Sequence, residues 1–266
     1  MRSRNSAPSF SASSFSAPSF SAVPFSAFTF QGVFVSRVVL ITGVGREGQV
    51  GEALARAFAD AGARLALVDR TAAQAERQAA ALRADGVEAH GFGCDLADEA
   101  QVAAMVAQVH AIAGDVDAVV CAAGGFAPTG PLDETAIPDI ERMLDINLKT
   151  AALTTRATLP MLRRTRGSLV YFGSAAVLPG AAGGGMAAYA IAKSGVLALM
   201  RAVADDERAH GVRANAVAPT SIRTAANVAS MGDRADYVSR EEVAASVLWL
   251  CSDAAAAVSG QVLRLG

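Results

Sequence analysis

From Arg37 onward, short apolar runs alternate with alanine-rich stretches that carry charged residues at helical spacing. The apolar runs have the length of buried strands, and the stretches between them are long enough to form crossover helices. This alternation predicts an α/β fold, in which a single doubly wound parallel sheet of about seven strands has helices on both faces. The predicted strands are 38–42, 63–69, 89–94, 118–122, 168–172, 213–217 and 261–265.

The chain divides into a regular part and an N-terminal tail. Residues 35–266 contain enough apolar sequence for one large core and predict a single domain. Residues 1–34 repeat Ser, Phe, Ala and Pro without a helical or strand period, so we expect a low-complexity, disordered tail. Two arginines, many serines and a lack of acids leave an organellar targeting peptide as a weaker alternative, beside an over-long start.

The overall charge and the cysteines bear on the class of partner. A formal net charge of -2 gives no basic excess for a phosphate backbone, so we expect no nucleic acid partner. No uninterrupted apolar run reaches the roughly 18 residues of a membrane span, so we expect no membrane partner. Cys94, Cys121 and Cys251 have neither metal-binding nor disulfide spacing. We therefore expect buried thiols, no metal site and a soluble, cytoplasmic protein.

A glycine-rich turn follows the first predicted strand. Residues 42–51 read Thr-Gly-Val-Gly-Arg-Glu-Gly-Gln-Val-Gly, and a helical stretch, 52–61, comes next. Glycines allow the backbone to approach a pyrophosphate closely, and free N–H groups at a helix N-terminus favour that anion. Such a turn is also common as a plain structural turn. Its place between a strand and a helix is what predicts a dinucleotide site.

An acidic residue, Asp69, closes the second predicted strand. A carboxylate here accepts hydrogen bonds from the adenosine ribose and repels a 2′-phosphate, which favours NAD over NADP. Arg46 and Arg70 partly offset that repulsion, so NADP stays the less favoured alternative. The structural alternative is that Asp69 caps the next helix, in competition with Thr71.

Tyr189 and Lys193 lie four residues apart in a stretch of strong helix formers, so both side chains project from one helix face. An isolated phenol has a pKa of about 10, and a neighbouring ammonium group stabilises the phenolate that acid/base chemistry near neutral pH requires. A Tyr-x-x-x-Lys pair is common by chance on exposed helices. The alanine-rich, apolar surroundings of this pair favour burial and a catalytic interpretation.

With these motifs in this order, residues 36–265 resemble the short-chain dehydrogenase/reductase family, whose fold is of the Rossmann type. The resemblance matches the family's catalytic residues to Asn147, Ser174, Tyr189 and Lys193. It matches the family's cofactor-binding residues to Gly43, Gly48, Val50, Gly51, Asp69, Asp95, Leu96, Ala123, Gly124, Lys193, Pro219, Ile222 and Thr224.

The resemblance implies an oxidoreductase that transfers a hydride between a nicotinamide cofactor and a small carbonyl or alcohol substrate, either 3-oxoacyl reductase-like or a general short-chain dehydrogenase. Tyr189 would exchange a proton with the substrate oxygen, and Ser174 would hydrogen-bond that oxygen. Lys193 would hold the nicotinamide ribose and lower the pKa of Tyr189, and Asn147 would support a proton relay through water. The structural alternatives are a strand-end turn for Ser174 and a helix kink for Asn147.

The chain departs from the family pattern at three places. The glycine turn is two residues longer than usual and places Gln49 where the family has its middle glycine, unless Gly48 takes that role. Residues 121–124 read Cys-Ala-Ala-Gly instead of Asn-Asn-Ala-Gly, so an amide that ties neighbouring strands is missing. The link between the fifth strand and the catalytic helix is also two residues longer, within 183–185.

These departures leave other functions open. Residues 124–126 and the segment after the sixth strand are similar to proteins related to dihydropteridine reductase. Phe126 and Met231 could stack on and cap a planar ring, or could simply pack beneath a lid. The unclear period of 220–239 predicts that lid. A non-catalytic dinucleotide-binding regulator is the alternative from another class, although the retained tyrosine and lysine argue against it.

By analogy with the family, we expect a homo-oligomer, either a dimer or a tetramer, with a small-molecule substrate. The apolar stripes of 140–162 and 189–204 could form its interface, or could equally be ordinary core faces. The two interpretations differ in oligomeric state, which light scattering measures.

Overall fold

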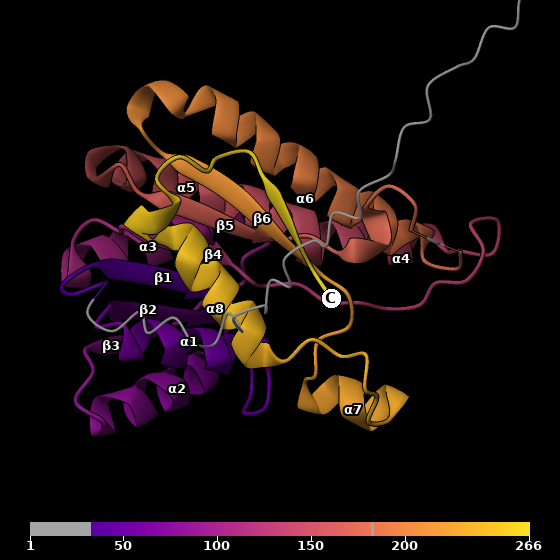
Figure 1. The fold of residues 1–266 in the computed structure, drawn as a ribbon, viewed down its shortest axis with the longest axis horizontal. Helices are drawn as coiled ribbons and strands as arrows, with labels where there is room; N and C mark the ends of the chain where they lie inside the picture. The colour runs from indigo at the N-terminus through magenta and orange to yellow at the C-terminus, as the bar shows by residue number, and fades with distance from the viewer. Residues whose placement is uncertain (1–32, 182–183) are drawn as a thin grey trace, which may run out of the picture.

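Seven parallel strands form one sheet in the order β3-β2-β1-β4-β5-β6-β7 (Figure 1). The computed structural model describes residues 33–181 and 184–266. The strands are β1 (Val38–Thr42), β2 (Arg64–Asp69), β3 (Ala89–Gly93), β4 (Ala118–Cys121), β5 (Ser168–Phe172), β6 (Arg213–Pro219) and β7 (Val262–Leu265). The predicted doubly wound sheet is confirmed, and no strand end differs from its prediction by more than two residues.

Helices cover both faces of the sheet, and an apolar core lies under each layer (Figure 1). Helices α1, α2 and α8 pack on one face, and α3, α5 and α6 pack on the other. The helices are α1 (Val50–Asp60), α2 (Ala72–Ala84), α3 (Glu99–Ala113), α4 (Ile137–Leu144), α5 (Thr150–Thr165), α6 (Ala187–Asp206), α7 (Ala225–Met231) and α8 (Arg240–Cys251). A π-helical turn is η2 (Asp145–Lys149), and the 3₁₀ turns are η3 (Ala175–Val177), η4 (Arg208–His210) and η5 (Asp253–Ala255).

The central strand β1 explains why the apolar runs of the sequence show no alternation. Val39 and Ile41 belong to the core on one face, and Val38 and Leu40 belong to the core on the other. Successive side chains of a strand point to opposite faces, so a strand covered on both sides is apolar at every position. All five residues of β1 are buried accordingly.

The first core includes Phe34, near the start of the described chain. Its side chain is fully buried, and its ring packs edge-on against Phe58 of α1 with the ring centroids 5.1 Å apart. Its N–H donates to the Ala61 carbonyl at 3.0 Å. Val33 also packs against this core, so the packed domain begins ahead of the boundary predicted at residue 35. The rest of the predicted tail, residues 1–32, lies outside the described residues.

Among the described helices, α6 is long and apolar enough to cross a membrane by length and composition. Its Val196, Leu197 and Met200 pack in the core on the second face of the sheet. These contacts are those of a core helix, and they orient the helix that carries the predicted catalytic pair.

A topological switch lies between β1 and β4, which are neighbours in the sheet although β2 and β3 come between them along the chain. The chain leaves β1 toward β2 on one side and leaves β4 toward β5 on the other. The carboxyl ends of strands at such a point leave a crevice in which ligands bind. The glycine-rich turn after β1 and the loop after β4 both lie at this crevice.

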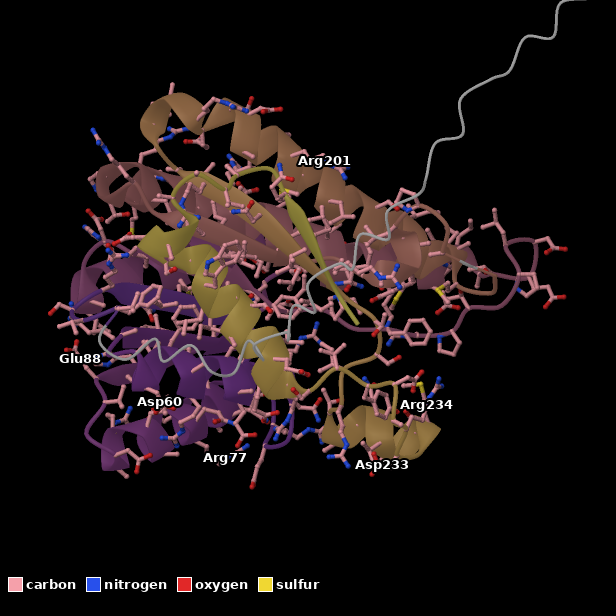
Figure 2. All side chains as sticks on the ribbon, viewed as in Figure 1. Asp60, Arg77, Glu88, Arg201, Asp233 and Arg234 are labelled. Carbon is pink, nitrogen blue, oxygen red and sulfur yellow. The ribbon has the colours of Figure 1, made fainter. Side chains whose placement is uncertain are left out.

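The predicted lid, residues 220–239, contains a short helix, α7, that the sequence does not predict. Its seven residues are too few to show a helical period. Ile222 pairs with Val238, so the two ends of the lid are tied together. Figure 1 shows α7 standing apart from the sheet, and Figure 2 shows Asp233 and Arg234 projecting outward beside it.

Candidate active site

The glycine-rich turn requires glycine for two different reasons. A β-carbon at Gly51 would lie 2.5 Å from the Val44 Cα, so only glycine allows α1 to pack this closely against the turn. Gly48 has a φ of +79°, in the left-handed region that favours glycine. Gln49 is extended, with a φ of -100°, and directly precedes α1. Gly48, rather than Gln49, therefore takes the glycine-requiring position of the lengthened turn.

A threonine hydroxyl ties the ends of β1 and β4 together. Thr42 Oγ1 donates to the Val120 carbonyl at 3.3 Å and accepts from the Ala123 N–H at 3.3 Å. This link joins the two strands at the place where the family's asparagine is missing. The loop after β4 thereby lies against the glycine-rich turn, where a β-carbon at Gly43 would be 2.5 Å from the Ala123 Cα.

Asp69 faces the glycine-rich turn from the end of β2. Its Oδ2 accepts from the Gly45 N–H at 3.0 Å, and its Oδ1 accepts from the Thr71 N–H at 3.3 Å. The residue that directly precedes α2 is Thr71, so the helix-cap alternative for Asp69 is wrong. Its carboxylate lies instead beside the turn, where an adenosine ribose is expected.

Asp95 and Leu96 follow β3, the next strand along this edge. The Asp95 Oδ1 accepts from the Ala97 N–H at 3.0 Å, and its carboxylate lies 3.7 Å from the Arg70 guanidinium. Leu96 is buried in the second core. Because β2 and β3 pair in parallel, Asp69 and Asp95 end on the same edge of the sheet. The predicted adenosine end of the site is thus brought together.

Ser174, Tyr189 and Lys193 meet at the carboxyl end of β5. Ser174 follows this strand and is buried, and α6 carries the other two residues. Lys193 Nζ donates to the Phe172 carbonyl at 2.8 Å and lies 5.8 Å from the centroid of the Tyr189 ring. The Ser174 side chain is close enough to the Tyr189 hydroxyl to lower its pKa. The structure therefore brings these predicted catalytic side chains together.

Burial is the main cause of the pKa shifts of Lys193 and Tyr189. It lowers the pKa of Lys193 to about 8, because a charged ammonium is costly away from water. It raises the pKa of Tyr189, and the Ser174 side chain opposes that rise. The net direction for Tyr189 is opposite to the lowering by Lys193 that the sequence predicts. Tyr189 therefore keeps its proton near neutral pH and is available as a proton donor.

Asn147 lies in the π-helical turn η2 between α4 and α5. Its Nδ2 donates to the carbonyls of Met143 at 3.1 Å and Gly125 at 3.0 Å, and its Oδ1 accepts from the Gly125 N–H at 3.1 Å. A β-carbon at Gly124 would lie 2.6 Å from Asn147 Oδ1 and 3.5 Å from Lys193 Nζ. Asn147 thus forms the expected kink and also holds the loop after β4 beside Lys193. Its part in a proton relay stays a prediction.

The predicted cofactor-binding residues after β6 lie on the segment that leads from this strand into the lid. Pro219 ends β6 and is buried, and Ile222 pairs with the far end of the lid. Thr224 caps α7 through its side chain. The next residue, Ala225, donates its N–H to the Gly48 carbonyl at 2.9 Å. The lid therefore contacts the glycine-rich turn directly.

Phe126 packs edge-on against the Tyr189 ring, with the ring centroids 5.1 Å apart. Its side chain is 58% exposed, so much of the ring is open beside the phenol. Met231, the predicted partner of Phe126 around a planar substrate, ends α7 and is exposed. Phe126 provides an apolar wall next to the predicted catalytic hydroxyl.

Two charged residues beside the turn, Glu52 and Arg240, were not predicted from the sequence. Glu52 Oε2 accepts from the Gly48 N–H at 2.7 Å and from the Arg240 guanidinium at 3.0 Å. Glu52 is the third residue of α1, where a carboxylate often reaches back to cap a helix, and this position is a signal that could have found it. Arg240 is 188 residues away along the chain, and no local pattern connects the two.

The residues at this edge fit a bound dinucleotide. The first turn of α1 presents backbone N–H groups at Val50 and Gly51, which suit a pyrophosphate. Asp69 would supply acceptors for ribose hydroxyls at one end, and Lys193 would supply donors at the other. The strand order β3-β2-β1-β4-β5-β6 places these groups along one continuous edge of the sheet.

A family model described as Enoyl-(Acyl carrier protein) reductase matches residues 43–265. D-threitol dehydrogenase of Mycolicibacterium smegmatis is 35% identical over 236 residues, covering 84% of this chain and 89% of that protein. Cis-4-hydroxycyclohexanecarboxylate dehydrogenase of Sinomonas cyclohexanicum is 33% identical over 242 residues, covering 87% and 96%. A solved structure assigned to the short-chain dehydrogenases/reductases, from Burkholderia xenovorans, has a TM-score of 0.77 and 30% identity, covering 88% of this chain and 96% of that one. The chain therefore belongs to the short-chain dehydrogenase/reductase family of oxidoreductases.

Proposed function

We propose that the chain is an NAD-linked dehydrogenase that interconverts a small secondary alcohol and its ketone. The observation that carries this proposal is the buried corner in which Lys193 bonds to the Phe172 carbonyl beneath the ring of Tyr189. When bound, the nicotinamide ring supplies the hydride acceptor or donor. The named relatives support this class, since both are dehydrogenases of hydroxylated compounds by name.

In the direction of ketone reduction, the hydroxyls of Ser174 and Tyr189 bind the carbonyl oxygen. Tyr189 gives its proton to that oxygen as negative charge develops there. The ammonium of Lys193 stabilises the phenolate that remains, and its bond to the Phe172 carbonyl holds it under the ring. Alcohol oxidation runs through the same groups in reverse, with the phenolate as the base.

The preference for NAD rests on Asp69. Its carboxylate accepts from the Gly45 N–H, which holds it beside the turn where the adenosine ribose binds. A carboxylate there accepts hydrogen bonds from ribose hydroxyls and repels a 2′-phosphate. Arg70 does not fully offset this repulsion, because it shares its charge with Asp95.

The substrate class rests on Phe126. Its open ring favours an alicyclic or alkyl substituent next to the reacting carbon, because burying apolar surface there is favourable. A cyclohexanol-type alcohol therefore suits this wall better than a polyol does. We expect Phe126→Ala to raise the KM for cyclohexanol about fivefold, and Phe126→Leu to raise it less. The KM for threitol should change less than twofold in both variants.

Steady-state assays with NAD⁺ and NADP⁺ test this proposal. The panel holds cyclohexanol, threitol, a 3-oxoacyl thioester and quinonoid dihydropterin, with the last two run against the reduced cofactors. We expect the highest kcat/KM for cyclohexanol with NAD⁺. Turnover of dihydropterin alone would favour the dihydropteridine reductase-like alternative. Tight NADH binding by calorimetry with no turnover of any compound would favour the regulator.

A cytoplasmic homo-oligomer completes the proposal. Within the described residues, Cys94, Cys121 and Cys251 are free and buried, which supports a reducing compartment. The oligomeric state rests on analogy with the family alone. Light scattering on the purified protein should give a mass of two or four chains, and a monomer would contradict this part of the proposal.

A further inference from the structure

Two N–H groups of the glycine-rich turn already donate to carboxylates of this chain. The Gly45 N–H donates to Asp69 at 3.0 Å. The Gly48 N–H donates to Glu52 at 2.7 Å. Asp69 has a place in the proposed ribose site, whereas Glu52 has no part in the proposed binding or chemistry. A negative charge on α1 is thus bonded to a turn whose expected ligand is itself an anion.

The position of Glu52 makes this charge effective. It is the third residue of α1, and the N-terminal turn of a helix favours negative charge through its dipole and its unpaired N–H groups. The carboxylate therefore occupies the same electrostatic environment that would attract a pyrophosphate. Its side chain is 34% exposed, so solvent screens the charge only in part.

Arg240 neutralises part of this charge. Its guanidinium lies 3.0 Å from Glu52 Oε2 and is 26% exposed. Arg240 is the first residue of α8, directly after the lid. The charge felt by an anion at the turn therefore depends on a residue that directly follows the lid.

We propose that Glu52 is an internal anion that competes with the dinucleotide pyrophosphate for the glycine-rich turn, and that Arg240 limits the strength of this competition. The proposal rests on the proposed dinucleotide function. Removal of the charge on Glu52 strengthens cofactor binding, and removal of the charge on Arg240 weakens it.

The same turn links this competition to the lid. Gly48 is held on both sides, because its N–H donates to Glu52 and its carbonyl accepts from the Ala225 N–H at 2.9 Å. A β-carbon at Gly48 would lie 2.8 Å from the Ala225 Cβ, so the lid is in close contact here. Displacement of Glu52 by a pyrophosphate frees one of the two bonds that position this contact.

Fluorescence titration of the full chain with NADH tests the proposal. In Glu52→Gln, the amide oxygen can still accept from the Gly48 N–H while the charge is lost, so NADH should bind about fivefold to tenfold more tightly. Arg240→Gln should bind NADH about fivefold more weakly. The matched control is Glu241→Gln, whose carboxylate also lies near Arg240, at 3.4 Å, but is 69% exposed on α8. This variant should bind NADH within twofold of the unaltered protein.

Two further ligands locate the effect at the pyrophosphate. The affinity for adenosine diphosphate ribose should change in each variant as the affinity for NADH does, because both ligands carry the same diphosphate. Adenosine lacks that group, so its affinity should be the same in Glu52→Gln and in the unaltered chain. Raising the salt concentration should shrink the difference between the two proteins. An equal gain for adenosine would overturn the proposal, since the effect would then not depend on the diphosphate.

The outcomes separate this proposal from the proposed function. If the unaltered chain binds no NADH by calorimetry, the proposed function fails, and this inference fails with it. If the unaltered chain binds NADH and Glu52→Gln binds it no more tightly, only this inference fails. If Glu52→Gln unfolds at a much lower temperature than the unaltered chain, the test passes to Arg240→Gln. Unchanged NADH binding by Arg240→Gln would contradict the proposal.

Discussion

The two ends of the crevice differ in what holds their functional groups. At the β5 and α6 end, Lys193 is 6% exposed and bonds to a backbone carbonyl of a central strand. At the β1 and α1 end, the turn is held by the pair of Glu52 and Arg240, which are 34% and 26% exposed. Packing against a strand fixes a geometry whatever the salt concentration, whereas a partly exposed ion pair responds to salt and to bound anions. The proposed chemistry therefore lies at the rigid end, and the proposed adjustment of cofactor affinity lies at the other.

The largest effect should come from the rigid end, with Tyr189→Phe. The change removes the proposed proton donor but keeps the ring that packs against Phe126. General acid–base catalysis contributes about 10² to 10⁴-fold to a rate, so kcat for cyclohexanol oxidation should fall about 10³-fold. The affinity for NADH, measured by titration, should stay within twofold. Unchanged turnover in Tyr189→Phe would show that the tyrosine is not the proton donor, and it would contradict the chemistry proposed for this end of the crevice.

The second effect is the pH dependence that Lys193 gives to stability. Burial lowers its pKa from 10.5 to about 8, so between these values the unfolded chain binds more protons than the folded chain. Its contribution to the free energy of unfolding therefore rises with pH through this window, by about 3 kcal/mol in total. Urea unfolding of the unaltered protein and Lys193→Met at several pH values measures the difference, which should increase from about pH 8 to pH 10.

Lys149→Met is the control for this measurement. Lys149 is the other lysine of the chain, and its side chain is 52% exposed. Its removal should leave the pH dependence of unfolding as it is in the unaltered protein. A stability difference between Lys193→Met and the unaltered protein that stays flat across the window would mean that Lys193 is not desolvated as the structure shows.

The two ends of the crevice also differ in how far the sequence predicts them. Two-sided burial leaves uninterrupted apolar runs, so the strands of the core were visible from residues such as Val38 to Thr42 alone. The spacing of Tyr189 and Lys193 on one helix is likewise a local property, and it placed both side chains on one face. The buried end of the crevice was predictable because each of its parts has a local signature.

The parts that escaped prediction depend on contacts between distant segments. Glu52 meets Arg240 from 188 residues away, and the Thr42 hydroxyl joins β4 from another strand. Asn147, in the π-helical turn, bonds through its side chain to the backbone of the loop after β4, which no helical period reveals. The sequence predicts that Lys193 lowers the pKa of Tyr189, but it does not reveal that burial raises this pKa overall.

A third, smaller effect should come from the charged end, with Asp69→Asn. The amide oxygen can keep the bond from the Gly45 N–H, while the charge that repels a 2′-phosphate is lost. The ratio of kcat/KM for NADP⁺ over NAD⁺ should rise about tenfold to thirtyfold. Asp60→Asn, on the outer side of α1, is the control and should leave the ratio unchanged. A ratio that stays constant in Asp69→Asn would place the ribose elsewhere.

The smallest effect should come from the lid, with Tyr237→Phe. The Tyr237 hydroxyl lies 3.2 Å from the Asn227 carbonyl and 3.0 Å from the Gly232 carbonyl, so it fastens α7 to the end of the lid. Loss of one hydrogen bond of this kind costs about 1 kcal/mol. Because α7 contributes no residue to either core, the loss should appear as about fivefold faster amide exchange within α7, with the unfolding midpoint in urea unchanged.

Tyr171→Phe is the matched variant for this lid experiment. The Tyr171 hydroxyl is 2.8 Å from Thr155 Oγ1 in the buried core beside β5. The same chemical change should here lower the free energy of unfolding by about 1 kcal/mol and leave exchange in α7 unaltered. Faster exchange in α7 for Tyr237→Phe alone, with a lower free energy of unfolding for Tyr171→Phe alone, would confirm that the lid opens independently of the sheet. A shared drop in the unfolding midpoint would mean instead that lid and sheet unfold as one unit, and the contrast between the two ends of the crevice would not extend to the lid.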